Sequence, residues 1–159
     1  MSDSTSAAKP LEVFYAYARE DEKLRKKLNK SISILIADGV IAPWYDRDVS
    51  AGLEWEHVID EHLNRANIIL LLISLDFIGS PYCYGIEMKR AMERHEAGEA
   101  RVIPILLRAI DWEKAPFRKL AGLPSNGKPV TSWSNRDEAY ADIAKGIRKV
   151  AEELRPNPR

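Results

Sequence analysis

The run Asn67-Ile-Ile-Leu-Leu-Leu-Ile-Ser74 is the feature that most restricts how this chain can fold. Its six central residues are all apolar, with no polar side chain at alternate positions. A strand with one face in water would alternate apolar and polar residues, so this pattern predicts a strand buried on both faces. Such strands are typical of parallel sheets covered by helices on both sides. The run is far too short to cross a bilayer.

Strand-like and helix-like segments alternate along the rest of the chain. Strands are expected at 11–17, 40–45, 67–74, 101–108 and 128–131. Helices are expected at 20–36, at 54–66 and from 80 onward, and a separate last helix ends at 154. This alternation predicts a doubly wound, flavodoxin-like α/β fold with a five-stranded parallel sheet in the order 2-1-3-4-5. The ligand crevice of such a sheet opens at the carboxyl ends of strands one and three. The flanking segments are 16–20, 46–52 and 74–87.

Three sequence signals mark helix ends. Ser80-Pro81 predicts a helix start, with serine as the N-cap and proline at the first helical position. Asp38-Gly39 predicts a helix end, because glycine tolerates a left-handed backbone. Ser134-Asn-Arg-Asp137 resembles a capping box that opens the last helix.

The bulk composition narrows the class of protein. The 159 residues suit one domain, expected over 10–154, with a disordered tail at 1–9 and a linker or tail at 155–159. Lysine plus arginine equals aspartate plus glutamate, 24 each, so a nucleic-acid partner is not expected. A single cysteine, Cys83, and the absence of a signal-like N-terminus favour a soluble, cytoplasmic chain without a membrane partner.

Glu87 is the carboxylate most open to a chemical role. The helix from Ser80 has an apolar face built from Tyr84, Met88, Ala91, Met92 and His95. At about 100° per residue, Glu87 borders that face, with Cys83 and Ser80 on the same flank. Two interpretations stay open: an exposed carboxylate paired with Arg90 or Arg94, or a catalytic group at the crevice.

The segment Trp44-Tyr-Asp46-Arg-Asp48-Val-Ser-Ala-Gly52-Leu-Glu-Trp55 also allows two interpretations. It could be a solvated loop in which Trp55 anchors the next helix in the core. It could instead form a mobile lip over a ligand, with aromatic rings that stack on a flat group. No metal site is expected, because His57, His62 and His95 lack ligand spacing, and no glycine-rich phosphate loop is present.

Together these segments resemble a bacterial TIR (Toll/interleukin-1 receptor) domain over residues 10 to about 153. Val13-Phe-Tyr-Ala-Tyr17-Ala-Arg-Glu-Asp21 is similar to the family's opening motif, and Trp44-x-Asp46 followed by Gly52-x-x-Trp55 to its BB loop. Ile68–Ser74 followed by Ser80-x-Tyr-Cys-Tyr-x-x-Glu87-Met resembles the third strand and the acidic helix, and Pro129-Val-Thr-Ser-Trp133 the late box.

The resemblance implies an activity. Many bacterial TIR domains cleave NAD⁺ at the nicotinamide–ribose bond with one glutamate, which corresponds to Glu87. Nicotinamide leaves as a neutral molecule from a cation, so no general acid is needed, in contrast to ordinary glycosidases. A fixed carboxylate then stabilises the positive charge that develops on the ribose. NAD⁺ is thus expected as the substrate, without a further cofactor.

The resemblance also implies substrate-binding positions. Tyr17 and Arg19 would line the ribose-phosphate side, and Ser74 the floor. The BB-loop side would comprise Trp44, Asp46, Gly52 and Trp55. Several family members have tryptophan four residues before the glutamate; Cys83 stands there in this chain, and either Tyr82 or Tyr84 could supply the ring.

Assembly belongs to the same expectation, because the BB loop of one TIR protomer usually completes its neighbour's site. The chain is therefore expected to be an assembly-activated NAD⁺ glycohydrolase or cyclase in antiphage defence, acting as a homo-oligomer or filament with a fused or separate sensor. The alternative is a non-catalytic module that acts by homotypic TIR–TIR binding, with Glu87 incidental. The product, the activating signal and the choice between NAD⁺ and NADP⁺ are not determined by the sequence.

Overall fold

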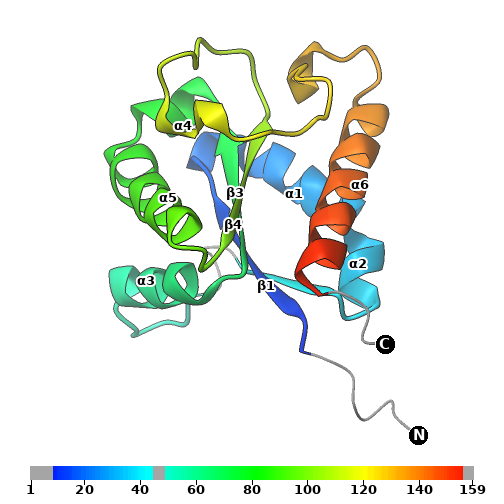
Figure 1. Cartoon of the computed structure of the whole chain (residues 1–159). Helices are drawn as coiled ribbons and strands as arrows, with labels where there is room; N and C mark the ends of the chain where they lie inside the picture. The colour runs from blue at the N-terminus through cyan, green and yellow to red at the C-terminus, as the bar shows by residue number, and fades with distance from the viewer. Residues whose placement is uncertain (1–8, 45–48, 156–159) are drawn as a thin grey trace, which may run out of the picture.

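The fold is a parallel sheet between two layers of helices (Figure 1). The computed structural model describes residues 9–44 and 49–155. Within them the sheet has the order β2-β1-β3-β4, formed by Leu11–Ala16 (β1), Ile41–Trp44 (β2), Ile68–Ile73 (β3) and Arg101–Leu106 (β4). β1 pairs with β2 from Leu11 opposite Ile41, and with β3 from Val13 opposite Ile68. The α/β class and the order of these four strands match the prediction.

Alternate residues of β3 face the two helical layers. Ile68, Leu70 and Leu72 pack in one cluster with α1 (Glu22–Ser31), α2 (Ser33–Ala37) and α6 (Arg136–Leu154). Ile69, Leu71 and Ile73 pack in the other with α3 (Trp55–Arg65), α4 (Leu75–Gly79) and α5 (Met88–Glu96). All six residues of β3 are buried, which confirms a strand covered on both faces.

The predicted fifth strand at 128–131 is wrong. Val130–Ser132 forms a short 3₁₀ turn (η6), and the described part of the sheet has four strands. After β4, the described chain returns to this edge of the sheet at an isolated parallel bridge between Ile105 and Leu123. A hydrogen bond from Thr131 N to Leu107 O (3.0 Å) lies just beyond the end of β4. Pro129 has no backbone N–H, so it cannot extend this contact into a ladder.

Two helices differ from the prediction in their detail. The helix expected at 20–36 is divided into a 3₁₀ turn at Arg19–Asp21 (η2), α1 and α2, with a break at Ile32. Gly39, at φ +72°, follows α2 in the predicted left-handed conformation. At the start of α6 the capping residue is Asn135, which accepts a hydrogen bond from Glu138 N (3.3 Å), one position later than predicted. A further 3₁₀ turn, Pro116–Lys119 (η5), lies in the segment before α6.

The helix predicted from Ser80 begins there, but its first part is a π-helix, Pro81–Glu87 (η4), which continues directly into α5. Ser80 is its N-cap and accepts a hydrogen bond from Cys83 N (3.1 Å). The short helix α4, between β3 and Ser80, was not predicted. π-Turns are rare and are frequently found at functional sites.

Candidate functional site

A pocket of about 400 Å³ opens where β1 and β3 end. Its walls come from Tyr17, Ala18, Arg19 and Glu20 after β1, from α4 and Ser80, from Tyr82 and Cys83 on the π-helix, and from Trp55 at the start of α3. These elements come together because parallel strands end at the same edge of the sheet. The structure thus brings Tyr17, Arg19, Trp55, Tyr82 and Cys83 of the predicted residues around one cavity.

Glu87 is the last residue of the π-helix and is only 5% exposed. The prediction placed it at the border of the core, on the assumption of a regular α-helix. The wider π-turn changes the angle between residues 81–87 and α5, and the side chain is buried instead. Glu87 is not among the residues that line the described pocket, but its charge acts on Tyr82, which does line it.

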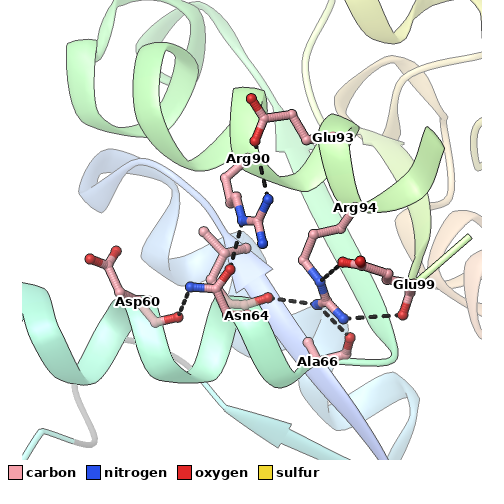
Figure 2. Close-up of polar contacts among 8 residues, drawn as sticks. Asp60, Asn64, Ala66, Arg90, Glu93, Arg94 and Glu99 are labelled. Carbon is pink, nitrogen blue, oxygen red and sulfur yellow. Dashed lines mark hydrogen bonds and ion pairs between the residues drawn. The ribbon is translucent and has the colours of Figure 1, made fainter. Parts of the chain in front are cut away.

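The two arginines considered as surface partners of Glu87 are engaged elsewhere (Figure 2). Arg90 Nε donates to Asn64 Oδ1 (2.6 Å), and its Nη1 donates to Glu93 (3.2 Å). Arg94 is buried, and its Nη1 donates to the backbone oxygens of Leu63 (2.7 Å) and Ala66 (2.8 Å). The interpretation of Glu87 as an exposed surface carboxylate is therefore wrong.

Tyr82 contacts Trp55 and lies within electrostatic reach of Glu87. Its ring centroid is 5.2 Å from that of Trp55, and the two planes are tilted by 36°. Burial raises the pKa of the Tyr82 hydroxyl far above its usual range, and the carboxylates of Glu87, Asp60 and Glu56 raise it further. The hydroxyl therefore remains protonated, as a hydrogen-bond donor, across the physiological pH range.

A polar network joins the ends of three strands, with Asp21 and Ser74 buried and Arg108 partly exposed. The Ser74 hydroxyl donates to Asp21 Oδ2 and accepts from Phe77 N (3.1 Å), which makes Ser74 the N-cap of α4. Arg108 Nε donates to the other oxygen of Asp21 (2.9 Å). Ser74, predicted at the floor of a binding site, is fully buried and holds this network together. Asp21 and Arg108 were not predicted as site residues, although Asp21 ends the opening motif.

Tyr17 contributes to both sides of the sheet end. Its hydroxyl donates to Glu22 Oε1 (2.5 Å), and Glu22 accepts from Arg25 Nη2 (2.8 Å). The Arg25 guanidinium lies 5.6 Å from the centroid of the Tyr17 ring. Arg25 as a whole is only 2% exposed. On the pocket side, the Cys83 thiol donates to the Tyr17 backbone oxygen (3.3 Å) and ties the π-helix to the end of β1.

Of the predicted BB-loop residues that the structure describes, only some lie near the pocket. Trp44 stacks on His62 at 4.0 Å between ring centroids and on Phe14 at 5.7 Å, and it does not line the pocket. Gly52 is exposed, at φ +89°, where a side chain would be strained. Asp46 lies outside the described residues. Thus Trp55 is the BB-loop residue that the structure brings to the pocket.

Comparison with known proteins identifies the family. The sequence matches the TIR domain model TIR_2 over residues 13–147, which is most of the chain. The chain belongs to the TIR domain family. The match extends from within β1 into α6 and so includes both the pocket and the π-helix.

Among curated proteins, this TIR domain is 54% identical over 139 residues to the uncharacterized protein y4lF of the bacterium Sinorhizobium fredii. The alignment covers 87% of this chain but 43% of y4lF, so the chain spans less than half of that relative. Among solved structures, it is similar to TIR domains of the activated Roq1 resistosome directly recognizing the pathogen effector XopQ. That match has 20% identity, covers 59% of this chain and 55% of the other, and has a TM-score of 0.49. No helix within the described ranges has the length and apolar character needed to span a membrane.

Proposed function

We propose that this TIR domain cleaves NAD⁺ at the bond between nicotinamide and ribose, with Glu87 as the catalytic carboxylate. The observation that carries the proposal is the placement of Glu87. It is a buried acid on a π-helix whose preceding residues, Tyr82 and Cys83, wall a cavity at the carboxyl ends of β1 and β3. A carboxylate removed from water acts strongly on a nearby charge, because little solvent screens it.

The proposed chemistry needs one acid. As the C–N bond to nicotinamide breaks, its electron pair neutralises the pyridinium ring, and positive charge develops on the ribose. The Glu87 carboxylate stabilises that charge, and water or another acceptor then attacks the sugar. Arg19, which lines the pocket, is suited to the pyrophosphate, and the Trp55–Tyr82 ring pair to the base.

Assembly is the second part of the proposal. Leu53, Trp55, Leu75 and Ile86 are large apolar residues between 44% and 71% exposed, and Trp55 and Leu75 line the pocket itself. Apolar side chains at the rim of a site favour coverage by another protein surface. We propose that a neighbouring TIR protomer covers this rim. A sensor, either fused or separate, controls the contact in this proposal, and the active protein works in antiphage defence in the cytoplasm.

The same apolar rim supports the second candidate function, a non-catalytic module that binds other TIR domains. One experiment separates the two: nicotinamide release from NAD⁺ by concentrated or clustered protein, with wild type compared to Glu87→Ala and Glu87→Gln. We expect the isosteric glutamine variant to lose roughly 10²-fold or more of the rate, as when other electrostatic stabilisers of a transition state are removed.

Glu93→Gln serves as the matched control, because Glu93 is an exposed acid on α5 that pairs with Arg90. It should retain the wild-type rate. Absence of release by clustered wild type would contradict the enzymatic function and leave the interaction module. Equal release by wild type and both Glu87 variants would show that another group performs the chemistry.

A further inference from the structure

The Tyr140 hydroxyl is a buried polar group without a hydrogen-bond partner among the described residues. Tyr140 is 4% exposed and belongs to the core cluster that α6 forms with the sheet. Buried hydroxyls in proteins are normally paired, because an unpaired one loses its hydration without compensation. The packing of this core would be served equally by phenylalanine, so the hydroxyl at this position needs another explanation.

The hydroxyl of Tyr140 points toward the carboxyl edge of the sheet. Tyr140 lies in the second turn of α6, and long side chains on a helix incline toward its N-terminus. That end of α6 lies on the same side of the molecule as α4 (Figure 1). The turn η6, which precedes α6, is bonded to the residue after β4, because Thr131 N donates to Leu107 O (3.0 Å).

Two guanidinium groups lie near this hydroxyl. Arg136 is the first residue of α6, one turn before Tyr140 on the same face, and it is exposed. Arg108 follows Leu107 and donates from Nε to Asp21 Oδ1 (2.9 Å). Burial raises the pKa of Tyr140, and the positive charges of Arg136 and Arg108 oppose that rise, so both act on the hydroxyl.

Both arginines have donors to spare within the part of the chain that the structure describes. Arg136 forms no hydrogen bond or ion pair there, and Arg108 uses its Nε alone, which leaves both of its Nη groups without a partner. The side chain of Arg108 is 46% exposed, so these groups are accessible from solvent. Three side chains thus bring unused donors to one place, and two of them are positively charged.

The charge at this place favours an anion. The N-terminus of α6 adds the partial positive charge of the helix dipole. Asp137 and Glu138, the acids of the first turn, are exposed and follow Arg136 by one and two positions, so they project from other faces of the helix. Asp21 offsets the charge of Arg108, but Arg136 has no such counter-ion among the described residues.

We infer that Tyr140, Arg108 and Arg136 form a binding site for a phosphate group at the start of α6. The Tyr140 hydroxyl donates to one oxygen, and the two guanidinium groups donate to the others. A terminal phosphate presents three such oxygens, whereas a carboxylate presents two. None of the three residues lines the pocket between β1 and β3, so the inference goes beyond the proposed function and does not depend on it.

The test is an NMR titration of the full chain, followed through the backbone amides of residues 136–140. Inorganic phosphate and adenosine 5′-monophosphate are added separately, with the ionic strength held constant by chloride. At least one should give saturable shifts at these amides, and the one that binds more tightly identifies the source of the phosphate. Tyr140→Phe should bind it about tenfold more weakly, as expected for one hydrogen bond to a charged acceptor. Arg136→Gln should lose at least as much affinity.

Arg148→Gln is the matched control, since Arg148 is an exposed arginine further along the same helix. It should keep the wild-type affinity. Because the Tyr140 hydroxyl has no partner among the described residues, Tyr140→Phe should unfold at or above the wild-type temperature without phosphate. If that variant does not fold, Arg136→Gln decides, because it alters an exposed side chain.

Three outcomes overturn the inference. The first is the absence of saturable shifts at residues 136–140 with both phosphates, and the second is shifts confined to the pocket around Arg19. The third is an affinity that both Tyr140→Phe and Arg136→Gln retain. Because the titration contains no NAD⁺, its failure would leave the proposed catalytic function untouched, and a loss of that function would leave the phosphate site standing.

Discussion

Arg94 provides a sharp test of how the helices beside the pocket are held. Leu63 O would accept a hydrogen bond from Asn67 N if α3 continued, but Asn67 N donates to Glu12 O instead (2.8 Å). Arg94 satisfies Leu63 O and Ala66 O at this helix end, and its Nη2 also donates to Glu99 O (3.1 Å) (Figure 2). It therefore fixes the end of α3 against α5, while the other end of α3 carries Trp55.

The magnitude follows from these contacts. Arg94→Met keeps a long apolar stem and removes the three donations to backbone oxygens. Each buried carbonyl left unpaired lowers the free energy of unfolding by about 1–3 kcal/mol, and by less where water reaches the oxygen. The favourable interaction of a cation with the C-terminus of α3 is lost as well. We expect the free energy of unfolding to fall by about 3–5 kcal/mol, a large part of the usual stability of one domain.

The assay is urea unfolding followed by circular dichroism, with two controls from the same cluster. Arg90→Met removes a cation whose ion pair with Glu93 is exposed on both sides, and Glu99→Gln weakens a 3.4 Å contact to a carboxylate that is 54% exposed. Each should change the unfolding free energy by less than about 1 kcal/mol. A loss of under about 1 kcal/mol in Arg94→Met would refute the reasoning, because the buried donations would then carry no net stability.

Two further predictions concern the polar groups near the sheet. Ser74→Ala removes both the N-cap of α4 and the donor to buried Asp21, so chemical denaturation should show that the free energy of unfolding falls by about 2 kcal/mol. Ser80→Ala removes a helix cap alone and should lower it by about 1 kcal/mol. Equal losses in the two variants would contradict this prediction. Burial lowers the pKa of His95, and the positive charges of Arg101 and Lys119 lower it further, while Glu96 raises it. The Nδ1 atom of His95 accepts a hydrogen bond from Val102 N (3.1 Å). The folded state thus favours neutral His95. Its contribution to the free energy of unfolding is complete above about pH 6.5 and is lost as the pH falls through the lowered pKa. Unfolding temperatures of His95→Asn, which can still accept from Val102 N, should therefore depend less on pH below 6.5 than those of wild type.

Much of the fold could be predicted because hydrophobic periodicity reports burial directly. The run at β3 and the helical spacing in α3, α5 and α6 each point to one arrangement. The fifth strand failed because a four-residue segment with a proline says little about whether a neighbouring edge is within hydrogen-bonding reach. The π-helix could not be foreseen because i→i+4 and i→i+5 hydrogen bonding suit the same residues, and packing chooses between them.

The candidate site could be predicted to a similar extent. The crevice segments 16–20 and 74–87 do form the pocket, because their place follows from the topology of the sheet. Trp44 stacks on His62 and Ser74 binds Asp21, and both depend on side-chain partners distant in sequence. Arg108 was missed for the same reason: it meets Asp21 across 87 positions of the chain.

The spacing of residues 81–87 has an evolutionary consequence. A π-turn contains one more residue than the α-turn it replaces, so removing a single residue there would restore an ordinary helix without disturbing the core that α5 packs against. Such a deletion would turn Tyr82 and Cys83 by about a quarter of a revolution relative to Glu87. The chain would still fold, but the buried acid and the two residues of the pocket wall would no longer have the relative orientation that they have in this protein.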